Sequence, residues 1–206
     1  MASTEIPEAV GSTKVIIEIP EVGNYKAISG ECEVIVVRNN EAGLDIPDYP
    51  KEVTYGDPQF EISFTYTGDA NVRVTGNDVI SAVLSGDKIL VTPKKAGSGE
   101  ITIRAEQNDH YEAIEKKITI RVKPKAVTLE WSTPNSFVYD NTEKKVTAKV
   151  SNSCIVGADV VTVTEYEDNA KTNAGKYTAV AKKLSDSNYT LEGATNTSYD
   201  WEITKA

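Results

Sequence analysis

Histidine, methionine and cysteine are nearly absent from this sequence, which has one histidine, one methionine and two cysteines in 206 residues. A Ser–His–acid or Cys–His catalytic site would need the single histidine beside a nucleophile, and no nucleophile motif is present. Two cysteines without CxxC spacing support neither a zinc site nor a disulfide framework. These absences predict a protein that is not an enzyme and that has no catalytic residues, metal site or cofactor.

Basic residues are also few, because 22 lysines and arginines face 31 aspartates and glutamates, which gives a net charge of −9. A nucleic-acid-binding protein needs a basic stripe, and none is visible, so we expect no nucleic-acid partner. No apolar run approaches the ~20 residues that span a bilayer, so we expect no membrane insertion. The segment MASTEIPEA at the N-terminus has neither a basic start nor an apolar core and does not resemble a signal peptide.

Valine, isoleucine, threonine and tyrosine are abundant, and these residue types favour strands over helices. Apolar and polar residues alternate in EISFTYT (61–67), EITIRA (100–105), KITIRV (117–122), VTLEW (127–131) and VTAKV (146–150). A period of two turns one face of a strand toward a core and the other toward water. Turn sequences such as TGDAN and KKAGSG separate the runs. The pattern predicts an all-β protein of tandem immunoglobulin-like antiparallel β-sandwiches.

One phrase occurs three times in the chain, with a glycine 14 positions before a tyrosine. The three copies are Gly11 with Tyr25, Gly97 with Tyr111, and Gly175 with Tyr189. The first two copies align without gaps at an offset of 86 residues, and the second and third align at an offset of 78. Repeat periods of this length predict an array of small domains. We expect the C-terminal part of a truncated repeat at 1–38 and two further repeats at 46–123 and 125–206.

The first copy starts in the middle of a repeat, because Met1 aligns with Asp87 of the second copy. We therefore expect a slice of a longer protein in which Met1 is an added start. Alternation makes one face of the fragment apolar, with Val15, Ile17, Ile19, Val34 and Val36. A lone hairpin is marginal in water, and its edges invite pairing. We expect residues 10–38 to be ordered by packing or strand exchange in a homodimer; the alternative is contact with the next repeat.

The tyrosine of each phrase falls in the loop before a final strand. A buried tyrosine there can pack its ring and bond its hydroxyl to nearby backbone, as in the tyrosine corner of Greek-key sandwiches. This structural role is our prediction for Tyr25, Tyr111 and Tyr189. The alternative is that the three rings stack against a ligand.

Three segments resemble a known family. They are SFVYDNTEKKVTAKV (136–150), TNAGKYTAVAKKLSDSNYTL (172–191) and WEITKA (201–206). They are similar to the MBG/YDG-type bacterial immunoglobulin-like repeats, whose pattern runs Tyr-Asp-Gly-Thr, Ala-Gly-x-Tyr, Asn-Tyr and a closing strand. Asn141 stands where that pattern has glycine, and asparagine tolerates a positive φ. Residues 46–123 resemble a sister subtype of the same arrays.

The resemblance implies a non-catalytic stalk, spacer or adhesion module in an extracellular protein, secreted or on a bacterial cell surface. Its partners would then be neighbouring repeats of the same chain. The connector RVKPKAV is typical of a spacer, because Pro124 stiffens it and it contains no flexible glycine or serine residues. The alternative function is binding of a glycan or host protein through exposed aromatic residues. Trp131 and Trp201 are the candidates, although both occupy apolar positions of strands, where core packing is expected.

The remaining candidate residues favour structural roles. His110 is expected to be a loop variant, since Asn24 and Asn188 occupy its place in the other copies. Cys32 and Cys154 are expected to act as small hydrophobes. Acidic loops at 68–71, 75–78 and 165–169 lack the spacing of a calcium site and are expected to be solvated turns. A Lys–Asn isopeptide bond would need a buried Lys, Asn and acid together, and the sequence leaves this open.

Overall fold

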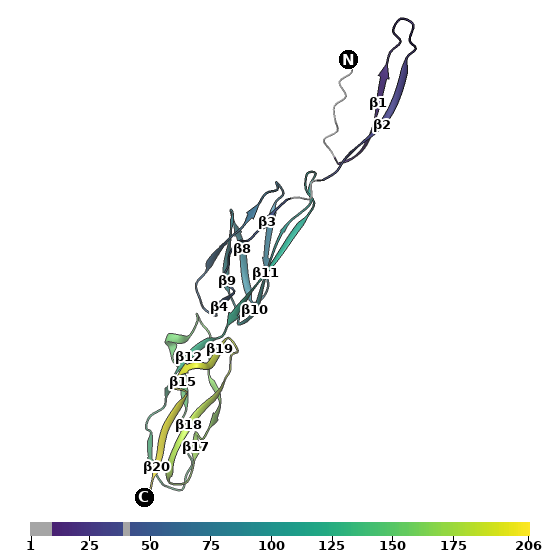
Figure 1. The fold of residues 1–206 in the computed structure, drawn as a ribbon. Coiled ribbons are helices and arrows are strands. Elements are labelled where there is room, and N and C mark those ends of the chain that lie inside the picture. Colours follow the sequence, from purple (N-terminus) through teal and green to yellow (C-terminus); the bar gives the residue numbers. More distant parts are fainter. Residues whose placement is uncertain (1–9, 39–41) are drawn as a thin grey trace.

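The computed structural model describes residues 10–38 and 42–206, which form a hairpin followed by two β-sandwiches (Figure 1). Within these residues the regular structure is β-strand, apart from the 3-10 turn η1 (Asn152–Cys154). The prediction of an all-β chain with tandem sandwiches is therefore confirmed. Figure 1 shows the three parts following one another along one direction, with the hairpin and the C-terminus at opposite ends.

The hairpin consists of β1 (Gly11–Ile19) and β2 (Ile28–Val36). The two strands pair antiparallel from Gly11↔Val36 to Ile19↔Ile28 without a register shift. Because successive side chains alternate between faces, Val15, Ile17 and Cys32 point to the same side of this ribbon. Its side chains are exposed or half-buried along both strands.

The first sandwich comprises residues 44–123. Its strands are β3 (Leu44–Asp45), β4 (Glu52–Thr54), β5 (Phe60–Ser63), β6 (Thr65–Tyr66), β7 (Val72–Gly76), β8 (Ile80–Ser85), β9 (Lys88–Pro93), β10 (Gly97–Ala105) and β11 (Ile114–Lys123). One sheet has the order β4-β11-β10-β7 and the other the order β5-β9-β8, while β3 pairs with β6. The period-two runs place their apolar side chains between the two sheets, including Ile101, Ile103, Ile118 and Ile120.

The second sandwich comprises residues 125–204. Its strands are β12 (Lys125–Trp131), β13 (Ser136–Val138), β14 (Lys144–Lys145), β15 (Ala148–Val150), β16 (Val163–Glu167), β17 (Ala170–Lys171), β18 (Gly175–Leu184), β19 (Tyr189–Thr195) and β20 (Ser198–Thr204). Its sheets have the orders β15-β12-β19 and β13-β20-β18-β16, and β14 pairs with β17. Asn141 adopts a φ of 61°, so asparagine does supply the left-handed residue at this turn.

The connection between the sandwiches is a single residue. β11 ends at Lys123 and β12 begins at Lys125, so Pro124 alone separates a strand of one core from a strand of the next. The carbonyl of Lys123 accepts a hydrogen bond from the Tyr55 amide (2.9 Å), and the amide of Lys125 donates to the Asn188 carbonyl (2.9 Å). The chain is therefore held on both sides of the proline.

Candidate functional site

The two tryptophans, which were the candidates for an exposed aromatic platform, belong to the second sandwich. Trp201 is 2% exposed, and its Nε1 donates to the Asp168 carbonyl at 3.0 Å. Trp131 is half-buried; it stacks on Tyr199 with 5.4 Å between ring centroids, and its Nε1 donates to the Asn196 carbonyl at 2.7 Å. Core packing, which the strand alternation predicts, therefore describes Trp201 fully and Trp131 in part.

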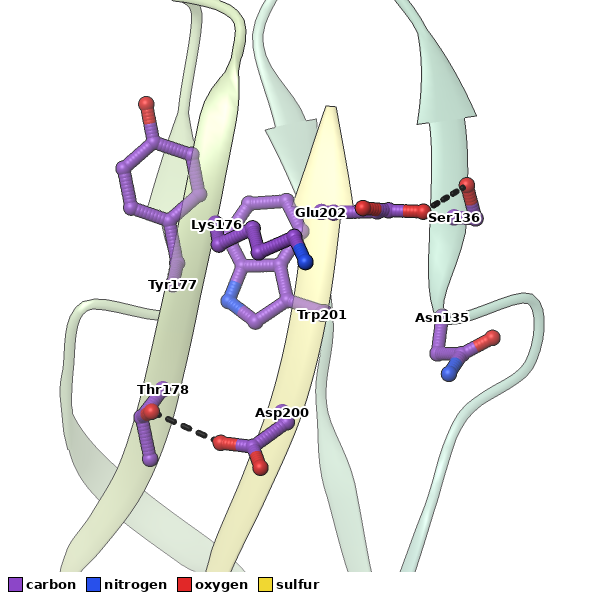
Figure 2. A pocket seen from close by; sticks show the side chains of 8 residues that line it. All are labelled: Asn135, Ser136, Lys176, Tyr177, Thr178, Asp200, Trp201 and Glu202. Atoms are coloured by element: carbon purple, nitrogen blue, oxygen red, sulfur yellow. Dashed lines mark hydrogen bonds between the residues drawn. The ribbon is translucent and has the colours of Figure 1, made fainter. Parts of the chain in front are cut away.

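A surface depression of about 510 Å³ lies over the sheet that contains Trp201 (Figure 2). Its lining residues are Asn135, Ser136, Lys176, Tyr177, Thr178, Asp200, Trp201 and Glu202. Several polar groups here already have partners: Thr178 donates to Asp200 at 2.7 Å, and Ser136 donates to Glu202 at 3.2 Å. Because the Trp201 ring is buried, this depression offers a sugar no tryptophan face on which to stack.

The repeated phrase forms a strand and a turn in all three copies, but only the first two are hairpins, because β18 pairs with β20 and β19 belongs to the other sheet. Each glycine begins a strand, namely β1, β10 or β18, and each tyrosine closes a tight turn before the following strand. In the first copy Val22 and Tyr25 exchange two backbone hydrogen bonds. In the second, the Asn108 amide donates to the Tyr111 carbonyl at 3.0 Å, and the Tyr111 amide donates to Asn108 Oδ1 at 2.8 Å. In the third copy Tyr189 donates its amide to the Asp186 carbonyl at 3.2 Å. The phrase is thus a turn signal that serves the fold.

The burial of the three tyrosines differs sharply. Tyr25 is 81% exposed at the tip of the hairpin, Tyr111 is half-buried, and Tyr189 is 4% exposed. The Tyr189 hydroxyl accepts a hydrogen bond from the Val156 amide at 2.8 Å. The predicted tyrosine-to-backbone contact is therefore made by Tyr189, whereas Tyr25 does not pack its ring.

Tyr189 also lies at the contact between the sandwiches. The hydroxyls of Tyr189 and of Tyr55, which belongs to the first sandwich, both donate to Asp159 Oδ2, at 2.7 and 2.8 Å. The two rings meet edge to face, with 5.6 Å between their centroids. One carboxylate therefore joins a tyrosine from each sandwich, and we call Tyr55, Asp159 and Tyr189 the junction triad.

The surroundings of the junction triad keep its tyrosines protonated. Burial, followed by the hydrogen bond to Asp159 and its charge, raises the pKa of Tyr55 to about 12. Burial is again the largest cause for Tyr189, whose pKa is raised to about 12 even though the Val156 amide acts in the opposite direction. Both hydroxyls therefore remain donors at neutral and mildly alkaline pH.

Apolar packing surrounds the triad. A single hydrophobic cluster contains Tyr55 and Val122 from the first sandwich and Val127, Leu129 and Tyr189 from the second. Gly56 lies directly against the Val156 side chain, in space that a β-carbon would have to share, and its φ is 84°. A further bond crosses the junction from the Ala96 amide to the Asn188 side chain at 2.8 Å. The repeated phrase pointed to Tyr189, whereas no sequence pattern placed Tyr55, Gly56 or Asp159 at a contact between the sandwiches.

The acidic loops and the histidine take part in local pairing. His110 Nδ1 lies 2.6 Å from Asp69 Oδ2, and this hydrogen bond, together with one from Asn108, lowers the pKa of Asp69. Asp78 pairs with Lys95 at 3.4 Å, and Glu165 pairs with Lys183 at 3.2 Å. Across residues 10–38 and 42–206, no three His, Cys, Asp or Glu side chains group together as metal ligands do.

The two cysteines occupy different environments. Cys32 is exposed on the hairpin, so the expectation that it is a packed small hydrophobe is wrong in this structure, because no residue of the described part of the chain covers its side chain. Cys154 is half-buried at the junction cluster, and its sulfur accepts a hydrogen bond from the Thr128 amide at 3.3 Å. No polar or charged residue of the described chain is buried, so the buried Lys–Asn–acid group of an isopeptide bond is not formed there.

Comparison with known proteins finds likeness only at the level of solved structures. No family model and no curated protein matches the sequence. The crystal structure of the S-layer protein SbsC domains 4 and 5 is 18% identical, with 47% of this chain and 63% of that fragment covered and a TM-score of 0.30. The Clostridium thermocellum CbhA fibronectin(III)-like modules are 16% identical, with 80% and 95% covered and a TM-score of 0.31.

The I-band fragment I67–I69 from titin is 11% identical, with 95% of this chain and 88% of that fragment covered and a TM-score of 0.40. Identities and TM-scores this low do not establish membership of a family, so the MBG/YDG assignment stays a prediction. Within the described residues, no helix has the length and apolar character that crossing a bilayer requires.

Proposed function

We propose that the chain is a non-catalytic structural spacer, a part of an array of MBG/YDG-type immunoglobulin-like repeats in a bacterial surface or secreted protein. The observation that carries this proposal is the junction, where two sandwiches share one hydrophobic cluster and a tyrosine from each donates to Asp159. A one-residue connector with a shared core resists bending far more than a flexible linker does. A spacer needs this property, because its task is to hold neighbouring domains at a fixed separation.

The residues that carry the family resemblance also serve the fold. Gly175 begins β18, and an added β-carbon there would lie 3.0 Å from the Tyr177 hydroxyl, which itself donates to the Asn173 carbonyl at 2.8 Å. Tyr139 packs on the core cluster that contains Trp201. These motif positions are occupied by turn and packing contacts, which supports a structural repeat over a ligand site.

Rigidity of the junction can be tested by measuring the distance between the two sandwiches. Spin labels at Asp87→Cys and Glu192→Cys, in a Cys32→Ser, Cys154→Ala background, report that distance by pulsed electron resonance. We expect one narrow distribution for the otherwise unchanged chain. Gly56→Ala should broaden it, because the new methyl group collides with Val156 and the residue has a positive φ.

Gly86→Ala is the matched control. Gly86 also has a positive φ, of 63°, but an added β-carbon there meets nothing within 4 Å. The distribution should therefore stay narrow in this variant. A broad distribution in the chain that carries only the two labels and the Cys32→Ser and Cys154→Ala substitutions would refute the stiff spacer, because the sandwiches would then move independently.

A further inference from the structure

The hairpin is a second copy of the strand pair at the centre of the first sandwich. Its register from Gly11↔Val36 to Ile19↔Ile28 is reproduced by β10 and β11 from Gly97↔Val122 to Ala105↔Ile114, at a constant offset of 86. The glycines that open the two ribbons have the same backbone conformation, with φ of 148° at Gly11 and 147° at Gly97. Each hairpin position thus has a known counterpart whose surroundings are visible.

The counterpart face is buried, whereas the hairpin face is exposed or half-buried. Ile101, Ile103, Ile118 and Ile120 belong to the first sandwich core, and Ile103 is 0% exposed. The equivalent hairpin residues are Val15, Ile17, Cys32 and Val34, and Ile17 is 57% exposed. We call the hairpin side that carries these residues the inner face. Among residues 10–38 and 42–206, no sheet packs over the inner face.

Both faces of the hairpin expose isoleucines, with Ile16 and Ile35 on the opposite face, but charge distinguishes the inner face from that one. The residues of the inner face are Thr13, Val15, Ile17, Ile19, Ile28, Gly30, Cys32, Val34 and Val36, and none is charged. The opposite face carries Lys14, Glu18, Glu31 and Glu33. With a net charge of −9, two copies of the chain repel each other over most of their surfaces, so an uncharged apolar face is where they can meet.

The inner face also has a different shape from its counterpart, because it has a glycine where the first sandwich has a lysine. Gly30 takes the place of Lys116, whose Nζ reaches Asp45 at 3.0 Å in the first sandwich. An added β-carbon at Gly30 meets nothing within 4 Å, so a gap lies beside Ile17, its cross-strand partner. An isoleucine from a facing ribbon can enter this gap without meeting a charge.

We infer that the inner face is a docking surface for the inner face of a second copy of this chain, with the two hairpins packed face to face about a two-fold axis. Such an arrangement is self-complementary, since Ile17 of each copy would fill the gap over Gly30 of the other. Two nine-residue strands cover roughly 300 Å² per copy at ~3.4 Å per residue and ~4.8 Å between strands. This is below the ~800 Å² per partner of a stable complex, so the dimer should be weak and concentration-dependent.

The test compares two lysine substitutions in the whole 206-residue chain under reducing conditions. Gly30→Lys introduces at the inner face the residue that the equivalent position of the first sandwich already tolerates. Ser29→Lys adds the same charge one residue away, on the opposite face. Sedimentation equilibrium between about 10 μM and 1 mM should show the mass rising toward two chains for the unchanged protein and for Ser29→Lys, but not for Gly30→Lys.

Cys32 provides an independent measurement on the same face. Its alkylation rate should fall several-fold across this concentration range, while the half-buried Cys154 serves as the internal reference. A chain that stays monomeric at the highest concentration overturns the inference, as does association that survives Gly30→Lys. Protection of Cys32 at low concentration would also overturn it, because the face would then be covered by its own chain. The inference is independent of the spacer function, whose test reads the distance between the sandwiches.

Discussion

The hairpin and the β10–β11 ribbon of the first sandwich share their register, their opening glycine and their apolar phase, yet only one of them is inside a core. Ile103 is completely buried, and Ile17, its equivalent, is more than half exposed. The difference comes from strands that are distant in sequence: β5, β8 and β9 complete the core around Ile103. Local alternation is therefore sufficient to form the ribbon, but burial depends on a second sheet.

The largest expected effect comes from removing the same side chain in both ribbons. Ile103→Ala should lower the free energy of unfolding of the first sandwich by about 2–5 kcal/mol, because it leaves a cavity in a closed core. Ile17→Ala should change it by less than about 0.5 kcal/mol. Denaturation followed by circular dichroism measures both, while tryptophan fluorescence reports only the second sandwich. Equal losses for the two variants would show that the hairpin is buried in solution.

Gly99 in the first sandwich and Gly30 in the hairpin allow the packing of the two ribbons to be compared. An added β-carbon at Gly99 would lie 3.0 Å from the Ile80 side chain and 3.1 Å from the Ile120 carbonyl. Gly99→Ala should therefore cost about 1–3 kcal/mol through overpacking. Gly30→Ala, in a position with open space, should stay within about 0.5 kcal/mol. The melting temperatures of the two variants check this, and a neutral Gly99→Ala would mean that Ile80 can move aside.

The repeated tyrosine allows the same kind of test at the junction and at the hairpin tip. Tyr189→Phe leaves the Val156 amide without its acceptor and removes one of the two donors to Asp159. It should destabilise the second sandwich by about 1–2 kcal/mol. Tyr25→Phe, at the exposed tip, should have no measurable effect. Urea denaturation followed by tryptophan fluorescence measures both variants. If Tyr189→Phe leaves the free energy of unfolding unchanged, the hydroxyl does not contribute to the stability of the junction.

The smallest expected effect concerns a charge pair that is reversed between the ribbons. Lys14 pairs with Glu31 at 3.5 Å in the hairpin, and at the equivalent positions Glu100 pairs with Lys117 at 3.2 Å. All four side chains are well exposed, so exchanging the charges in either ribbon should change stability by less than about 0.5 kcal/mol. Melting curves at low and at high salt measure this. A larger change that persists in salt would indicate a pair that is shielded from water.

The sequence alone predicted what depends on neighbouring residues. Period-two alternation predicted the strands and the burial of Ile101 and Trp201. The repeated phrase predicted the turn that ends in Tyr189. The junction triad could not be found in this way, because Tyr55 and Asp159 are 104 residues apart and meet only when two finished sandwiches dock. The exposure of Cys32 was missed for the same reason. Alternation places Cys32 on the apolar side of its strand, but it does not show whether a second sheet covers that side.

The single-residue connector has a consequence for a chain that is pulled from its ends. On one side of Pro124, β11 is paired in parallel with β4 up to Lys123; on the other, β12 is paired in parallel with β19 from Lys125 onward. Tension along the chain therefore enters each sandwich through a strand whose parallel neighbour must slide past it. Hydrogen bonds loaded in this direction carry the force together, instead of opening one after another as they would at a peeled edge. Pro124 thus lies between two parallel strand pairs, each of which is loaded in shear when the chain is pulled.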